Sequence, residues 1–157
     1  MPVIDVGRLY RSHGHIVLRR ARTLLGSEAD AQEALQEVFA SLLRSPGAVH
    51  EAGSVVSWLY QATTHFCLNQ LRNRRSSARL LEQRPRAEPA GPRAEALAEV
   101  RSLLSKMPPQ VAAAVVYHHL DGMTHTEVAA MLGCSRRQVG YLLERAQQSL
   151  QHAEQSA

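Results

Sequence analysis

The stretch MTHTEVAAMLGCSRRQVGYLLERAQQSL, residues 123–150, decides the fold of the C-terminal part of this chain. Thr124 followed three residues later by Glu127 is the capping-box pattern that begins a helix, and apolar residues then recur at helical spacing. Gly133 suits the left-handed conformation that ends such a helix, and Ser135 suits the cap of a second one. Two short helices joined by a glycine-containing turn predict a helix-turn-helix.

The second of these helices carries the side chains that would read DNA. In a helix-turn-helix, the N-terminal residues of the second helix contact base edges in the major groove. Arginine pairs with guanine and glutamine with adenine through two hydrogen bonds each, and both residue types occur here. We therefore predict DNA contacts from the following residues: Ser135, Arg136, Arg137, Gln138 and Tyr141. The alternative interpretation of this segment is an ordinary pair of helices with a solvated polar face.

The composition favours an all-α protein. Of the 157 residues, 45% are hydrophobic and only 4% are aromatic, which permits a packed core. The sequence shows no long alternation of β-branched residues of the kind that predicts strands. The sequence has no uninterrupted run of about 18 apolar residues, so we predict no membrane span, and the N-terminus lacks the charged-then-apolar pattern of a signal peptide. Cys67 and Cys134 stand far apart and outside any CxxC pattern, which predicts no disulfide and fits a reducing cytoplasm.

Apolar residues at helical spacing continue through the N-terminal half of the chain. They predict a first helix that ends at Gly26 and a second that runs from Ser27 to about Leu43. A loop is expected from Ser45 to about Gly53, because Ser-Pro-Gly stops the second helix. Ser54 is then expected to cap a third helix.

A proline-rich segment separates this half from the helix-turn-helix half. The segment Arg84–Pro92 holds three prolines and a glycine, a composition typical of linkers. We predict two small helical domains, residues 1–80 and 94–157, joined by a flexible linker at residues 81–93.

The positive charge of the chain is local. Between Gln70 and Arg86 stand six arginines and one acid, Glu82, so this segment has a charge of +5. The whole chain has a net charge of +4, so the other residues together sum to −1. A local basic run is an electrostatic footprint for phosphate backbones. An alternative interpretation of equal weight is a solvated helix end whose arginines complement the helix dipole.

Three segments, in order along the chain, resemble the extracytoplasmic-function (ECF) sigma factors, the smallest family of bacterial sigma factors. ALQEVFASLL at Ala34–Leu43 is similar to the family's region-two helix, which docks on the clamp of RNA polymerase. SVVSWLYQATTHFCLNQLRNRR at Ser54–Arg75 is similar to the family pattern WLxxIAxNxxxDxxRRxxR. The segment from Leu103 to Ala146 resembles region four, which ends in a helix-turn-helix.

The resemblance implies partners and contact residues. Core RNA polymerase would bind, through the clamp of its β′ subunit, the outer face of the second helix: Glu33, Gln36 and Glu37. The displaced strand of the minus-10 element would contact Ser54, Ser57 and Trp58, and phosphates would contact Arg72, Arg74 and Arg75. The helix-turn-helix would read the minus-35 element of promoter DNA. An anti-sigma factor is a further expected partner, and the expected location is the cytoplasm.

Two aromatic residues in these segments have competing interpretations. Phe39 fits the apolar core of the N-terminal domain, residues 1–80, better than the clamp-binding surface. Trp58 fits a buried anchor better than a platform on which a base of the melted strand stacks. The expected protein catalyses nothing and needs no cofactor.

The chain departs from the family pattern at several positions. Ala34 replaces the usual acid before the Gln-Glu pair, His65 replaces an asparagine, and Asn69 replaces an aspartate. In the second helix of the helix-turn-helix, Gly140 stands where the family often has lysine, and glycine in a helix interior costs about 1 kcal/mol relative to alanine. The target promoter therefore does not follow from the resemblance.

Two other classes of function compete with this interpretation. A helix-turn-helix regulator that never binds polymerase would share the C-terminal half but leave the N-terminal domain, residues 1–80, unexplained. A metal protein or enzyme would use the 8 histidines, but no HExxH, CxxC, GxSxG or phosphate loop occurs. His118 and His119 are neighbours on a predicted helix and are expected to point to different sides, so we predict no metal site.

Overall fold

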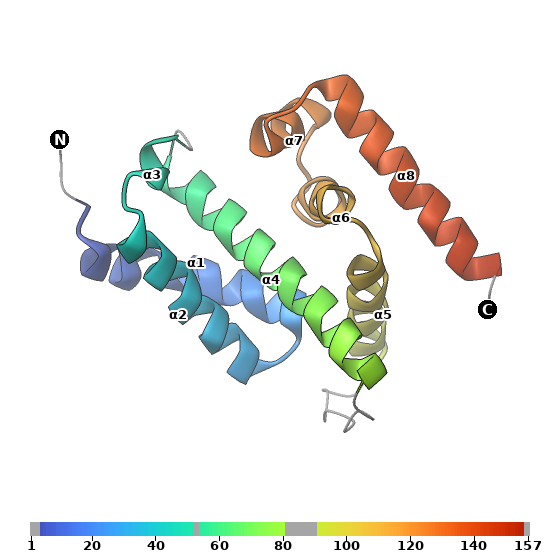
Figure 1. Ribbon diagram of the computed structural model, residues 1–157, viewed down its shortest axis with the longest axis horizontal. Helices are drawn as coiled ribbons and strands as arrows, with labels where there is room; N and C mark the ends of the chain where they lie inside the picture. The colour runs from blue at the N-terminus through green and yellow to red at the C-terminus, as the bar shows by residue number, and fades with distance from the viewer. Residues whose placement is uncertain (1–3, 52–53, 81–90, 156–157) are drawn as a thin grey trace.

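The computed structural model describes the backbone of residues 4–51, 54–80 and 91–155, all of it helical or irregular (Figure 1). The predicted all-α class is confirmed. The helices in chain order are α1 (Val6–Leu25), α2 (Glu28–Arg44), α3 (Ala48–Glu51), α4 (Val55–Leu80), α5 (Pro92–Lys106), α6 (Pro109–Val115), the π-helix η1 (Val116–Leu120), α7 (His125–Leu132) and α8 (Arg136–Gln155). Residues 81–90, most of the predicted linker, lie outside the described residues.

Local capping sets the boundaries of the first helices where the sequence predicts them. Gly26 ends α1 with a φ of 71°, and the Ser27 hydroxyl accepts a hydrogen bond of 3.3 Å from the backbone N–H of Asp30. At the start of α4, the Ser54 hydroxyl accepts 3.0 Å from the backbone N–H of Ser57. These contacts satisfy N–H groups that have no partner inside their own helix.

Helices α1, α2 and α4 enclose the first apolar core. Phe39 lies within it at 4% exposure and meets the ring of Tyr10 edge-on at a centroid distance of 5.1 Å, which confirms the core interpretation of Phe39. The loop predicted after α2 is partly wrong, because α3 forms inside it. Val49 of α3 is buried in the same core, so this turn is anchored to the first core.

The second apolar core joins the two halves of the chain. Its buried residues come from α1, α2 and α4 as well as from α5, α6, η1, α7 and α8; among them are Leu24, Leu71, Leu104, Val111, Val128 and Val139. In Figure 1, α5 and α6 lie beside α4, and the contacts between these helices agree with that view. The C-terminal half therefore packs directly on the N-terminal half.

The predicted helix-turn-helix is confirmed in α7 and α8. The Thr124 hydroxyl accepts 3.1 Å from the Glu127 N–H, and the Glu127 carboxylate accepts 3.0 Å from the Thr124 N–H, which completes the capping box. The hydrogen bond that the Glu127 carboxylate accepts from the Thr124 backbone N–H lowers the pKa of Glu127, and the Thr124 side chain adds to this effect. Gly133 ends α7 with a φ of 67°, and the Ser135 hydroxyl accepts 3.0 Å from the Gln138 N–H to begin α8.

The helix before the helix-turn-helix ends in a π-helix. In η1 the N–H of Asp121 donates to the carbonyl of Val116, five residues earlier. The rings of His118 and His119 lie 4.8 Å apart, edge to face, so the prediction that they point to different sides of the helix is wrong. The wider π turn rotates less per residue than an α-helix, which brings neighbouring side chains closer together.

Two glycines of the helix-turn-helix give a matched stability prediction. A Cβ at either Gly133 or Gly140 would meet no atom within 4 Å, but only Gly133 has a positive φ. Gly140→Ala should therefore stabilise the fold by about 0.5–1 kcal/mol, since alanine loses less backbone entropy in a helix interior. Gly133→Ala should destabilise it by about 1–2 kcal/mol, because Cβ disfavours the left-handed conformation. Thermal melts of the two variants should shift in opposite directions; two shifts of the same sign would contradict this.

Candidate nucleic-acid and polymerase interfaces

The first turns of α8 present polar side chains to solvent. Arg136, Arg137 and Gln138 are all exposed, and Tyr141 is 55% exposed. The opposite face of the helix is buried in the second core through Val139 and Leu142. Because Ser135 caps α8, the predicted DNA-contacting residues cluster at its N-terminal end. Here the backbone N–H groups of the helix also favour phosphate.

The predicted minus-10 residues lie where α4 begins. Ser54 is exposed, Ser57 is half-buried, and Trp58 is half-buried with one side packed on the first core. Trp58 also lines a hollow of about 430 Å³, which we call the turn hollow. Its other wall is the end of α7 from Met131 to Gly133, so the turn of the helix-turn-helix faces this tryptophan.

The three predicted phosphate contacts on α4 have different surroundings. Arg72 donates to the side chain of Asn69 at the surface. Arg74 forms an ion pair with Asp30 and donates 3.2 Å to the Leu25 carbonyl at the end of α1. Arg75 is half-buried. Arg74 therefore ties α4 to α1 and α2 in this arrangement.

The outer face of α2 carries the residues predicted to meet polymerase. Glu33 and Gln36 are exposed, and Glu37 forms a surface ion pair of 2.8 Å with Arg44. Leu43 on the same helix is 66% exposed. The inner face of α2 is buried, so this surface is separate from the core.

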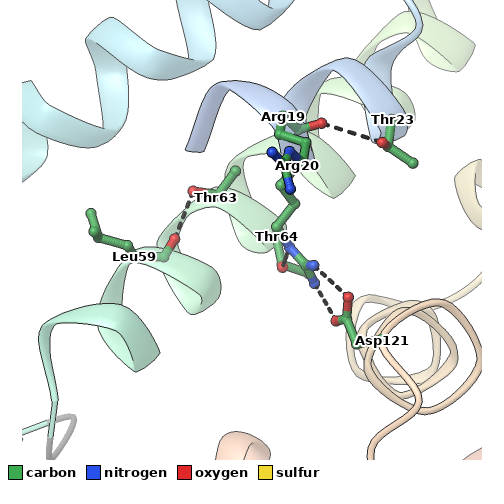
Figure 2. Close-up of polar contacts among 7 residues, drawn as sticks. All are labelled: Arg19, Arg20, Thr23, Leu59, Thr63, Thr64 and Asp121. Carbon is green, nitrogen blue, oxygen red and sulfur yellow. Dashed lines mark hydrogen bonds and ion pairs between the residues drawn. The ribbon is translucent and has the colours of Figure 1, made fainter. Parts of the chain in front are cut away.

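One polar cluster was not predicted from the sequence (Figure 2). Arg20 of α1 is buried, and its guanidinium donates 2.7 Å to each carboxylate oxygen of Asp121 and 2.8 Å to the Thr64 hydroxyl. The side chains of the pair are only 8% and 18% exposed. The guanidinium also lies 4.8 Å from the ring centroid of Tyr60. We call the Arg20–Asp121 pair the latch, because it joins α1 to the end of η1.

The structure offers little reactive or metal-binding chemistry. Within the described ranges, no three His, Cys, Asp or Glu side chains are placed to share a metal ion. Burial raises the pKa of the Cys67 thiol to about 12, so this group is a core residue rather than a nucleophile. None of the described helices has the length and apolarity that a membrane span requires.

Each half of the chain matches a known protein family model. The family model of sigma-70 region 2 matches residues 9–77, and that of sigma-70 region 4 matches residues 97–150. The ECF RNA polymerase sigma factor SigM of Mycobacterium tuberculosis is 30% identical over 145 residues, which cover 91% of this chain and 74% of SigM. The chain belongs to the ECF sigma factors.

Other relatives agree with this assignment. The ECF sigma factor SigE of Mycolicibacterium smegmatis is 31% identical over 160 aligned residues, which cover 96% of this chain. This chain spans 61% of the length of SigE. Sigma factors are regulators rather than enzymes. The region 2 match also covers the block that a polymerase-independent regulator would leave unexplained, so that alternative is not favoured.

Two solved structures share the fold. CnrH in complex with the cytosolic domain of CnrY is 24% identical, with a TM-score of 0.57 over 96% of this chain and 88% of CnrH. The sigma factor RpoE, in complex with the anti-sigma factor NepR from Bartonella quintana, is 16% identical. Its TM-score is 0.58 over 94% of this chain and 95% of RpoE. These likenesses support the all-α arrangement of both halves.

Proposed function

We propose that this ECF sigma factor binds core RNA polymerase and directs it to promoters. Residues 1–80 would act as the region 2 domain and residues 94–157 as the region 4 domain. The observation that carries the proposal is the presence of both sigma regions, in order, in one chain whose predicted DNA-contacting residues on α8 are exposed. The chain itself would catalyse nothing and would work in the cytoplasm, where polymerase and promoter meet.

The duplex and the melted strand would contact different helices of the chain. The first turns of α8 would read minus-35 base edges in the major groove. Ser54, Ser57 and Trp58 would hold the displaced minus-10 strand, because an aromatic ring beside polar groups suits stacking of an unpaired base. The α4 arginines 72, 74 and 75 would contact phosphates, and Arg74 would exchange Asp30 for a phosphate to do so.

A protein partner would hold the sigma factor when it is not needed. RpoE, which shares the fold, was solved with an anti-sigma factor bound. The same class of partner is therefore our expectation for this chain.

Transcription by purified components tests the proposal. Core polymerase supplied with the chain should initiate at a limited set of positions on fragmented genomic DNA. The DNA upstream of those starts should share two short elements at fixed spacing. Start positions identical to those of core polymerase alone would refute the proposal.

The outer face of α2 gives a prediction for polymerase binding. Glu37→Arg should weaken binding to core polymerase by at least about tenfold, because like charges brought together at an interface cost one to several kcal/mol. Arg44→Ala is the matched control, since it breaks the same surface ion pair without adding positive charge to the face. Surface pairs of this kind contribute little stability, so the control should bind like the parent. Equal affinity of Glu37→Arg and the parent would remove α2 from the interface.

A further inference from the structure

Besides the second apolar core, three polar contacts among the described residues join the two sigma regions. The first is the latch, in which one buried guanidinium serves both halves: it contacts Thr64 of region 2 and Asp121 of region 4 (Figure 2). Arg20 lies on the core-facing side of α1, next to the fully buried Ala21. A buried arginine needs this degree of pairing, because an unpaired buried charge is strongly unfavourable.

The second junction lies at the C-terminal end of α1. Arg101 of α5 donates 3.2 Å to the carbonyl of Thr23, so a cation sits at the negative end of the helix. A Cβ at Gly26 would lie 2.5 Å from the guanidinium carbon of Arg101. The glycine that ends α1 therefore also leaves room for the side chain that docks there.

The third junction lies beside Trp58 of the proposed minus-10 surface. The amide of Gln61 lies 3.9 Å from the sulfur of Met131, across the turn hollow from Trp58. The end of α7 thus lines the same hollow as Trp58, one of the three residues proposed to hold the displaced strand. A strand stacked on Trp58 would have to share this hollow with the turn of the helix-turn-helix.

We propose that this closed arrangement is autoinhibitory: the Arg20–Asp121 latch holds the turn of the helix-turn-helix beside Trp58, and the free chain binds the displaced strand only after the latch opens. The inference rests on the proposed strand-binding role of that surface. A charged pair suits a reversible closure, because hydration of both charged side chains on opening offsets the loss of their attraction. Exposure of apolar surface to water has no such compensation. Its bidentate geometry also fixes one relative orientation of the two regions.

A cross-linking experiment tests closure in the full-length chain. Cysteines are introduced at Ala48 of α3 and Ala130 of α7, which both line the turn hollow, with Cys134→Ser to remove the half-buried thiol. A short, cleavable bismaleimide should join them rapidly. Asp121→Asn should slow cross-linking about tenfold, the change expected when a dominant closed state becomes a minor one.

The chain offers a matched control for the latch on the same helix. Arg22 and Glu28 form another bidentate pair, at 2.6 and 2.9 Å, but both side chains are more than half exposed and both belong to region 2. Glu28→Gln changes the same chemistry without touching the latch and should cross-link like the parent. Arg20→Lys keeps the charge but cannot form the two-pronged pair, and should give an intermediate rate. Circular dichroism confirms that each variant is folded.

Strand binding is measured on the same proteins with a fluorescent single-stranded 20-mer of random sequence. Apparent affinity scales with the open fraction, so Asp121→Asn should bind about tenfold more tightly than the parent. The cross-linked parent should lose binding and regain it when the linker is cleaved. Equal cross-linking of Asp121→Asn and the parent would overturn the latch, and an open variant with unchanged affinity would overturn inhibition. Failure of every variant to bind the strand, even with core polymerase present, would instead refute the proposed strand-binding surface.

Discussion

Val139→Asp will unfold the helix-turn-helix and remove binding of duplex DNA by the chain. Val139 is 0% exposed and belongs to the second core, where it packs with residues such as Val128 and Leu142. The substitution loses about 1.5–3 kcal/mol of apolar burial and adds an unpaired buried carboxylate. Since domains are stable by only about 5–15 kcal/mol, this loss is a large fraction of the total.

A second substitution separates burial from charge. Tyr141→Asp places the same charge two positions along α8 on a side chain that is 55% exposed. Its free energy of unfolding should stay within about 0.5 kcal/mol of the parent, as is usual for surface changes. Thermal and urea unfolding followed by circular dichroism measure both variants. A cooperative transition of Val139→Asp at the parent's midpoint would show that Val139 is not a core residue.

The parts of the fold that the sequence predicts are those set by near neighbours. The capping box of Thr124 and Glu127 and the helix end at Gly133 depend on residues at most five positions apart. The exposed face of α8 follows from helical periodicity, which places Val139 and Leu142 on the opposite side. These signals were enough to predict the candidate DNA-contacting residues as exposed.

The junction between the two regions was not predictable in the same way. Arg20 and Asp121 are 101 positions apart, and no local pattern connects them. One clue was present, because Arg20 interrupts the buried stripe of Val17, Ala21 and Leu24. A charged residue on a core-facing helix surface indicates a buried partner without saying where in the chain it lies.

Two smaller differences also come from packing and backbone geometry. Val49 is buried and anchors α3 inside a segment whose composition indicates only a loop. The π-helix η1 places His118 and His119 together, although the sequence contains neither proline nor glycine between Val116 and Leu120 to mark a change in winding. The pairing of Arg74 with Asp30 likewise depends on how α2 and α4 cross.

Base reading by α8 should depend on two side chains in its first turn. Arg137 and Gln138 are exposed next to the helix cap, where side chains of a recognition helix reach base edges. Each good bidentate contact contributes about 1–3 kcal/mol of discrimination against a wrong base. Replacing either with alanine should therefore relax the preferred minus-35 sequence at one or two positions and lower affinity for the parent's best site by roughly 5- to 150-fold. Arg136, at the edge of the helix, is expected to contact phosphate and to change affinity without changing preference.

The measurement is a selection of preferred duplexes by the full-length chain bound to core polymerase, because the shared core argues against isolating region 4. Arg145→Ala is the matched control for Arg137→Ala: it removes the same charge from an exposed position of α8, two turns further from the cap. Loss of a phosphate contact lowers affinity for all sequences alike and flattens the salt dependence, whereas loss of a base contact changes which sequence is selected. Arg145→Ala should at most lower affinity for all sequences alike, whereas Arg137→Ala and Gln138→Ala should change which sequence is selected. If Arg137→Ala and Gln138→Ala select the parent's sequence with the parent's affinity, base reading lies elsewhere on the helix-turn-helix.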